Sequence, residues 1–188
     1  MTSNTPIQSL GADIRSLRKT RGLTLNALAD QVGKSVGWLS QVERDLSHPT
    51  PDDLEQFCRA LQVPPELLQQ HHAAVSSETG VIVRKTNRRA IGHRRDGLTE
   101  ELLSPDLTDD FEVVHSVFHP NSHLPEPCSR PTQELGYVIE GRLDIVIDGT
   151  PYTVDQGDSF RIRGQAYQWS NPYDAPCVVV WIIAPPVY

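Results

Sequence analysis

The sequence predicts a protein of two domains that differ in fold class: an N-terminal all-α domain of five short helices and a C-terminal all-β domain. Residues 1–72 are rich in Leu, Ala, Gln and Arg and place apolar residues at helical spacing, whereas residues 81–188 hold most of the Val, Pro and Tyr in alternating or apolar runs. The small, polar, glycine-terminated stretch from Ala73 to Gly80 is typical of a linker. We therefore expect a helical domain over residues 7–71, a linker over 72–80 and a β domain over 81–188.

Length and composition exclude several classes of protein. No apolar run approaches 18 residues, so the sequence predicts no membrane-spanning helix. Met1–Leu10 lacks the basic start and apolar core of a signal peptide. Three cysteines that are far apart, Cys58, Cys128 and Cys177, favour a reducing compartment over a disulfide framework. We expect a cytoplasmic protein that makes no membrane contact, and the small size of each half favours oligomerisation.

The formal net charge of −7 is unevenly distributed. Residues 1–48 carry six Lys/Arg against four Asp/Glu, whereas residues 98–188 carry four against fourteen. An acidic domain beside a weakly basic one should weaken non-specific binding to any polyanion, nucleic acid included. Between them, residues 84–95 hold six Lys/Arg and no acid. This basic run could contact DNA phosphates, pair with the acidic domain or form a solvated face, and we favour the last two.

Apolar spacing and capping residues predict the five helices. Leu10, Ile14 and Leu17 share one helix face, and Gly22 is the expected left-handed stop. Each later helix has its own start signal: Thr24 and Ser35 as N-caps, Pro51, and the pair Pro64-Pro65. Cys58 lies at helical spacing with apolar neighbours and is expected in the core.

The stretch from Leu23 to Arg44 is the most informative part of the chain. It predicts two short helices joined by a tight turn, with the second helix partly free to enter a DNA groove. The motif Leu-Ser-Gln-Val-Glu-Arg at 39–44 and the order of the helices resemble the phage-repressor-like (XRE-type) helix-turn-helix family over Ile7–Leu68. The resemblance implies that the third helix is the recognition helix and reads double-stranded DNA in the major groove.

Within this resemblance, Gln41 can pair bidentately with adenine and Val36 can contact a thymine methyl group. Gly37 costs the helix about 1 kcal/mol relative to Ala, which a close approach to DNA would explain. Thr24, Lys34 and Arg44 are placed for contact with phosphates. The full set of expected DNA-contacting residues is Thr24, Lys34, Ser35, Val36, Gly37, Ser40, Gln41 and Arg44. Arg18 and Glu43 match positions that form an internal ion pair. Trp38 could stack near the DNA backbone or pack between helices.

The second half contains several runs that predict strands: Val81–Val83, Phe111–Phe118, Leu135–Ile139, Leu143–Ile147, Tyr152–Val154, Ser159–Ile162 and Val178–Ile183. Glycine-containing turn signals separate several of them, and this spacing favours a sandwich or jelly roll. Residues 134–141, 154–158 and Asn171-Pro172 resemble the two sequence motifs of the cupin family, a jelly-roll barrel. Residues 102–107 resemble cupin domains fused to this same helix-turn-helix, so the resemblance covers nearly the whole chain.

The chain departs from the cupin pattern at the metal ligands. Metal-binding cupins usually carry His-x-His and Glu in the first motif and His in the second, and these positions here hold Cys128, Arg130, Glu134 and Tyr167. Only Glu134 is a usual ligand, and a guanidinium stays protonated and cannot ligate a metal. We therefore expect no metal in the usual cupin geometry and no cofactor. A weaker metal alternative lies in a proline-rich stretch that favours a loop: His119, His123, Glu126 and Cys128.

Strand alternation directs the residues at the former ligand positions into the barrel. A guanidinium beside a carboxylate and two aromatic rings suits an organic ligand that bears a carboxylate, with or without an amine. The candidate ligand-binding residues are His115, Cys128, Arg130, Glu134, Tyr167 and Trp169. Two alternatives stay open: an Arg130–Glu134 ion pair that replaces the metal as a structural staple, and a purely structural role for His115.

Together, the two resemblances imply a transcriptional regulator, not an enzyme, whose operator affinity is modulated by a small organic ligand in a metal-free cupin barrel. Because one such module reads only a half-site, we expect a homodimer on a pseudo-palindromic operator. One alternative is a metal-dependent cupin enzyme fused to a helix-turn-helix, which would need the missing ligand set. Another is a repressor whose cupin only dimerises. The apolar tail 184–188 is one candidate for the dimer surface.

Overall fold

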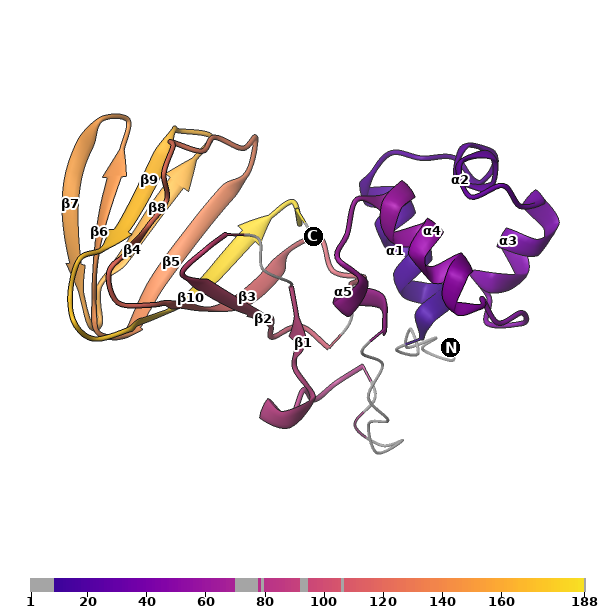
Figure 1. The fold of residues 1–188 in the computed structure, drawn as a ribbon, viewed down its shortest axis with the longest axis horizontal. Helices are drawn as coiled ribbons and strands as arrows, with labels where there is room; N and C mark the ends of the chain where they lie inside the picture. The colour runs from indigo at the N-terminus through magenta and orange to yellow at the C-terminus, as the bar shows by residue number, and fades with distance from the viewer. Residues whose placement is uncertain (1–8, 70–77, 79, 92–94, 106, 188) are drawn as a thin grey trace, which may run out of the picture. The chain divides into compact units, whose positions relative to one another are not determined.

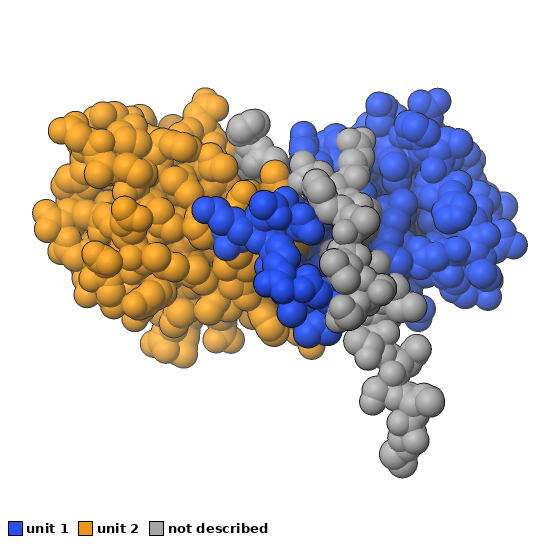
Figure 2. All heavy atoms as spheres, turned by 90° about the horizontal axis from the view of Figure 1, so that it is seen from below, with its two compact units in different colours: residues 1–89, 104–109, 188 blue, residues 90–103, 110–187 orange. Residues whose placement is uncertain are grey.

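The computed structural model describes residues 9–69, 78, 80–91, 95–105 and 107–187, and it forms two compact units (Figure 2). The helical unit comprises the chain up to Arg89 together with Ser104–Asp109. The barrel unit comprises Ala90–Leu103 and Asp110–Val187. Residues 81–89 thus belong to the helical unit, although the sequence predicts a β domain that begins at residue 81.

Among its described residues, the helical unit contains five α-helices (Figure 1): α1 (Leu10–Thr20), α2 (Leu25–Gln31), α3 (Val36–Val42), α4 (Pro51–Leu61) and α5 (Pro65–Gln69). The predicted caps are present, since the side chains of Thr24 and Ser35 accept hydrogen bonds from backbone amides three residues ahead, at 3.1 and 3.2 Å. Pro51 occupies the start of α4, and Gly22 follows α1 with a φ of 65°. The all-α prediction for this part is confirmed.

An apolar core holds these helices together, and Cys58 is buried in it as predicted, so that burial raises the pKa of its thiol. Fully buried side chains from all five helices meet there: Ile14, Leu17, Leu28, Leu39, Phe57, Leu61, Leu67 and Leu68. The packing of α1 on α3 depends on Gly11, because a Cβ there would lie 2.2 Å from the carbonyl oxygen of Val42.

A buried ion pair completes the helical unit. Arg89 donates to the Asp13 carboxylate of α1 at 2.5 Å, and the two side chains are 2% and 0% exposed. Arg89 also donates to the carbonyl oxygens of Leu67 at 3.3 Å and Pro105 at 3.4 Å. The other Asp13 oxygen accepts from the backbone amide of Leu107 at 3.2 Å. Four distant stretches of sequence therefore meet at one buried charge pair.

The barrel unit is built from two sheets, in which the neighbouring strands from β2 onward pair in antiparallel fashion. The six-stranded sheet has the order β1 (Arg89–Ala90), β2 (Leu98–Leu102), β3 (Glu112–Phe118), β10 (Cys177–Ala184), β5 (Gln133–Glu140) and β8 (Ser159–Arg163). The four-stranded sheet has the order β4 (Ser122–His123), β9 (Tyr167–Asn171), β6 (Arg142–Ile147) and β7 (Thr150–Asp155). The jelly-roll prediction is confirmed, and Figure 1 shows the two layers facing each other.

Two predictions of strands need correction. Val81–Val83 forms no strand and is followed by the 3₁₀ helix η1 (Lys85–Asn87). The sequence did not predict strand β2. Its inward positions are Leu98, Glu100 and Leu102, and the glutamate between the two leucines interrupts the apolar alternation that would indicate a strand. In the part of the chain that the model describes, no helix is long and apolar enough to cross a membrane.

Candidate functional site

The first candidate site is the outer surface of α3 and the turn before it. Leu39 and Val42 anchor the helix in the core, so its opposite face is left toward solvent. Of the eight predicted DNA-contacting residues, Ser40 is half-buried and seven are exposed. The exposed residues are Thr24, Lys34, Ser35, Val36, Gly37, Gln41 and Arg44. Thr24 caps the start of α2, whereas the other seven residues lie on α3, in the turn before it or just after its end.

Gly37 has no packing role within the described structure. A Cβ built at this position meets no atom within 4 Å. Replacing Gly37 by a larger residue would therefore cost the folded chain no space. The described fold therefore gives no steric reason for a glycine at this position.

Lys34 already has partners inside the chain. Its ammonium lies 2.6 Å from the carboxylate of Asp53 and 5.0 Å from the ring centre of Trp38. The hydrogen bond from Lys34, helped by the backbone amide of Thr50, lowers the pKa of Asp53. Trp38 in turn stacks on Phe57, with ring centres 6.0 Å apart and planes inclined by 6°, which gives it the packing role.

The predicted ion pair between Arg18 and Glu43 is confirmed. The guanidinium of Arg18 donates to both carboxylate oxygens, at 2.5 and 2.9 Å, and to the carbonyl oxygen of Leu23 at 2.9 Å. Hydrogen bonding to Glu43 raises the pKa of Arg18. This pair ties α1 to the end of α3 and so helps to hold α3 in place.

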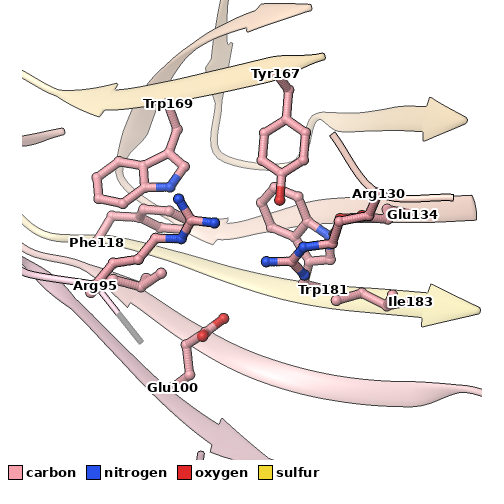
Figure 3. A pocket seen from close by; sticks show the side chains of 10 residues that line it. Arg95, Glu100, Phe118, Arg130, Glu134, Tyr167, Trp169, Trp181 and Ile183 are labelled. Atoms are coloured by element: carbon pink, nitrogen blue, oxygen red, sulfur yellow. Dashed lines mark hydrogen bonds between the residues drawn. The ribbon is translucent and has the colours of Figure 1, made fainter. Parts of the chain in front are cut away.

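The second candidate site is a cavity inside the barrel unit (Figure 3). The volume open to water within it is about 20 Å³, room for about one water molecule. Side chains from both sheets and from the loops line it: Arg95, Leu98, Glu100, Phe118, Arg130, Glu134, Tyr167, Trp169, Trp181 and Ile183. Four of the six predicted ligand-binding residues are among them.

Glu134 is held by neutral donors. The hydroxyl of Thr132 donates to one carboxylate oxygen at 2.6 Å and the indole N–H of Trp181 donates to the other at 2.7 Å. No Arg130–Glu134 contact within 4.0 Å occurs between these two described side chains. The alternative of a direct ion-pair staple is therefore wrong.

Arg130 faces the cavity as a half-buried cation. Burial opposes its charge, yet interaction with Tyr167, Glu134 and Cys128 raises the pKa of Arg130 overall. Burial raises the pKa of Tyr167, which stays a neutral phenol at physiological pH. Figure 3 shows the Tyr167 hydroxyl directed toward the Arg130 side chain.

Two predicted residues lie outside the cavity wall. His115 is on the face of β3 opposite to Phe118, because residues 112, 114, 116 and 118 are the buried positions of that strand. Cys128 pairs through its backbone with Tyr167 in both directions at 2.8 Å, and its side chain reaches Arg130 without lining the cavity. Cys128 thus contributes at the margin of the site.

Arg95 and Glu100 were not predicted as site residues. Arg95 was noted only as part of the basic run, and nothing in its immediate sequence indicates a barrel position. Trp181 could have been found, since Val179, Trp181 and Ile183 alternate through the apolar run of β10.

The basic run therefore divides into different roles. Arg84 forms an exposed pair with Glu78, which fits a solvated surface. Arg89 pairs with Asp13 of the helical unit, not with the acidic barrel. Arg95 enters the cavity. Arg94 lies outside the described residues.

The donor set does not fit the metal that many cupins hold. Both oxygens of Glu134 are occupied by hydrogen bonds, the neighbouring position is a guanidinium, and Tyr167 is a poorly acidic phenol. Across the described part of the chain, no three His, Cys, Asp or Glu side chains gather as a metal site. His119 of the weaker alternative set instead lies 2.8 Å from the hydroxyl of Thr99. The former ligand positions of the described barrel therefore offer hydrogen bonds and a positive charge rather than a set of metal ligands.

Comparison with known proteins matches both halves of the chain. Residues 9–70 match the family model of a helix-turn-helix domain, and residues 114–183 match that of a cupin domain. A relative from Mycobacterium tuberculosis named as an uncharacterized HTH-type transcriptional regulator is 32% identical over 118 residues, which cover 53% of this chain and 84% of the relative. The HTH-type transcriptional regulator SutR of Escherichia coli is 28% identical over 155 residues, which cover 81% of this chain and 80% of SutR. The solved HTH_3 family transcriptional regulator from Vibrio cholerae aligns over 95% of this chain and 96% of its own, with 20% identity and a TM-score of 0.44.

Proposed function

Since this chain belongs to the helix-turn-helix transcriptional regulators and carries a C-terminal cupin domain, we propose that a small organic ligand in the cupin barrel controls its affinity for operator DNA. One observation carries the proposal. The Arg130 guanidinium enters a cavity with aromatic walls, and no described carboxylate lies within ion-pair distance of it. A guanidinium in that setting favours a ligand with a carboxylate.

The DNA contacts follow from the exposed face of α3. Gln41 reads a base, Val36 packs against a thymine methyl group, and Thr24 and Arg44 bind phosphates. Lys34 can add a phosphate contact while it stays near Asp53, because its side chain is about one third exposed. Replacing Gln41 by Ala should weaken specific binding by about 1–3 kcal/mol and relax the preference at one base step.

We also propose that the regulator binds as a homodimer, because one helix-turn-helix module reads only half of a pseudo-palindromic operator. Exposed apolar side chains on the outer face of the six-stranded sheet support a second copy as the partner. Leu135, Tyr137 and Ile139 of β5 are 40%, 46% and 44% exposed. Ile182 of β10 is paired in register with Leu135 and extends this apolar surface.

The path of the chain supports coupling between the ligand and the DNA reader. Strand β2 supplies Leu98 and Glu100 to the cavity and ends at Leu102. The chain then passes into Ser104–Asp109, which belongs to the helical unit. There the amide of Leu107 donates to Asp13 of α1, and its carbonyl oxygen accepts from the hydroxyl of Ser16. A shift of β2 on ligand binding would therefore act on α1 through a few residues of chain.

The test is a binding measurement on the full-length protein. Fluorescence anisotropy would compare DNA from upstream of its own gene with random DNA at ~0.15 M salt, where non-specific binding is weak. The same titration would be repeated with acetate, succinate, citrate and L-glutamate as carboxylate probes. We expect a preference for the upstream DNA, and a change of about 5–150-fold in operator affinity with at least one probe.

Two results would overturn the proposal. Equal affinity for upstream and random DNA would refute specific operator binding. Intact specific binding that responds to none of the carboxylates would refute carboxylate sensing, and would favour a cupin that only dimerises. Native mass spectrometry of the freshly purified protein would report subunit number and any co-purified small molecule in one measurement.

A further inference from the structure

Two arginine side chains share the barrel cavity. Arg95 comes from the segment before β2, and Arg130 comes from the segment before β5. Figure 3 shows both guanidinium groups projecting into the same cavity, that of Arg95 beside Trp169 and that of Arg130 beside Trp181. The cavity lining therefore brings together two guanidinium groups and two carboxylates, those of Glu100 and Glu134.

Neither guanidinium is neutralised by a direct contact. In the described chain, no carboxylate lies within 4.0 Å of Arg95 or Arg130. Glu134 uses both oxygens on Thr132 and Trp181. Glu134 acts on Arg130 only beyond ion-pair distance, where its charge contributes to raising the pKa of Arg130. Each guanidinium can therefore still make a direct, charge-assisted contact with an anionic ligand.

The cavity also contains one carboxylate with a free side, that of Glu100. One of its oxygens accepts from the hydroxyl of Ser116 at 3.2 Å. A zwitterionic ligand would use Glu100 for an ammonium and one arginine for a carboxylate, and would leave the second arginine unpaired. A ligand with two acidic groups would pair both arginines and leave Glu100 with its hydrogen bond from Ser116, so a diacid satisfies the two charged groups that no described carboxylate contacts.

The walls and the size of the cavity limit the rest of the ligand. Phe118, Trp169 and Trp181 offer apolar surface, which suits a short carbon chain between the acidic groups. Since the open volume is about 20 Å³, a ligand larger than a water molecule can enter only if the two long arginine side chains change rotamer. A bulky or aromatic ligand would not fit in this way.

We infer that the barrel cavity binds a short aliphatic dicarboxylate, one carboxylate on Arg95 and the other on Arg130. This inference rests on the proposed ligand-sensing function and names the class of its ligand. Each arginine makes a charge-assisted, bidentate contact, and the aromatic side chains cover the carbon chain between them. Glu134 acts on neither carboxylate and serves to orient Trp181.

Calorimetric titration of the full-length protein tests the inference, with succinate as the probe. Butyrate has the same carbon count and a single carboxylate, β-alanine is a zwitterion, and inorganic phosphate is a compact anion. We expect succinate to bind at least about tenfold more tightly than each of the other three, since one further charge-assisted contact is worth about a factor of ten or more.

Substitution of the arginines sharpens the test. Arg95→Met and Arg130→Met should each weaken succinate binding by about tenfold or more and leave butyrate binding within a few-fold of its own value. Arg161→Met is the matched control, since Arg161 lies exposed on β8 outside the cavity, and it should change neither. Arg95→Lys and Arg130→Lys keep the charge, and they should retain part of the succinate affinity if the methionine variants fail to fold.

The inference is overturned if succinate binds no better than butyrate, if β-alanine or phosphate binds as tightly, or if Arg95→Met leaves succinate binding unchanged. Its failure is distinguishable from failure of the proposed function. Succinate binding without any change in operator affinity would refute ligand control of DNA binding but keep the ligand class. Control of operator affinity by a monocarboxylate or an amino acid would refute the dicarboxylate as the ligand class but keep ligand control of DNA binding.

Discussion

Arginine is enclosed in both units of this protein, and its surroundings differ sharply between them. In the helical unit, Arg89 contacts the Asp13 carboxylate at 2.5 Å and two backbone carbonyl oxygens. In the barrel unit, Arg95 and Arg130 enter a cavity in which no described carboxylate contacts them. A guanidinium whose partners are all supplied by the fold stabilises that fold. A guanidinium whose partner is missing is suited to bind one from solution.

The same contrast extends to the other charges of the helical unit. Arg18 is paired with Glu43, and Lys34 is paired with Asp53. The helical unit thus uses its internal charges to fix the position of α3, which is what a rigid DNA reader requires. In the barrel cavity, by contrast, no described carboxylate contacts Arg95 or Arg130, which leaves them able to pair with a ligand. Four changes would break or sharpen this contrast.

The largest effect is expected from Asp13→Ala. It leaves Arg89 as a buried cation without its carboxylate, and it removes the acceptor for the Leu107 amide. Breaking a buried ion pair in this way costs about 3–5 kcal/mol. Urea unfolding followed by far-ultraviolet circular dichroism would measure the loss, with the exposed Asp30→Ala as control. A loss as small as that of the control would show that the Arg89 environment is not structural.

A smaller loss of folding stability is expected from Glu43→Gln. The amide can accept only one of the two hydrogen bonds from Arg18, and it removes the charge that this partly buried guanidinium faces. A charge-assisted hydrogen bond contributes about 1.5–3 kcal/mol. Because the pair positions α3, operator affinity should fall together with stability in this variant. Unchanged affinity at reduced stability would separate the ion pair from the orientation of the recognition helix.

The structure of the helical unit could be predicted well because its signals are local. The caps Thr24 and Ser35 lie next to the helices they begin. Glu43 belongs to the motif at 39–44, so its ion pair with Arg18 could be expected from the family resemblance. The buried role of Arg89 could not be predicted, because its partner Asp13 is 76 residues away. The sequence of the basic run at residues 84–95 does not indicate which of its arginines pairs with a carboxylate far away in the chain.

The barrel site was predicted in part for a related reason. Arg130 and Tyr167 stand at positions that the cupin motifs define, whereas Arg95 stands in a segment without a motif. His115 was placed in the cavity because β3 is apolar on both of its faces, with Val113 and Val117 on one and Val114 and Phe118 on the other. Where both faces are apolar, alternation cannot say which one is inward.

The third prediction uses pH on the Lys34–Asp53 pair. Hydrogen bonding from Lys34 lowers the pKa of Asp53 in the folded chain, so its stabilisation is complete above the unfolded pKa of about 4 and is lost as the pH falls through the lower folded value. Asp53→Asn mimics the protonated acid. The stability gap between wild type and this variant should therefore be constant at neutral pH and close on acidification below about pH 4. Asp52→Asn, at the neighbouring exposed carboxylate, serves as the control, and a gap that does not depend on pH would contradict the assigned pair.

The smallest effect on stability, and the most discriminating, is expected from Arg130→Met in the absence of ligand. Methionine keeps much of the length of the side chain, fills the apolar surroundings and removes a cation that no described carboxylate contacts. Replacing an unpaired, half-buried charge by an apolar residue is expected to be neutral or to stabilise the fold by about 1 kcal/mol. The urea unfolding transition of the barrel unit, followed by the fluorescence of Trp169 and Trp181, would measure this. Destabilisation comparable to that of Asp13→Ala would mean that Arg130 already has its partners within the fold, and the contrast between the two units would then disappear.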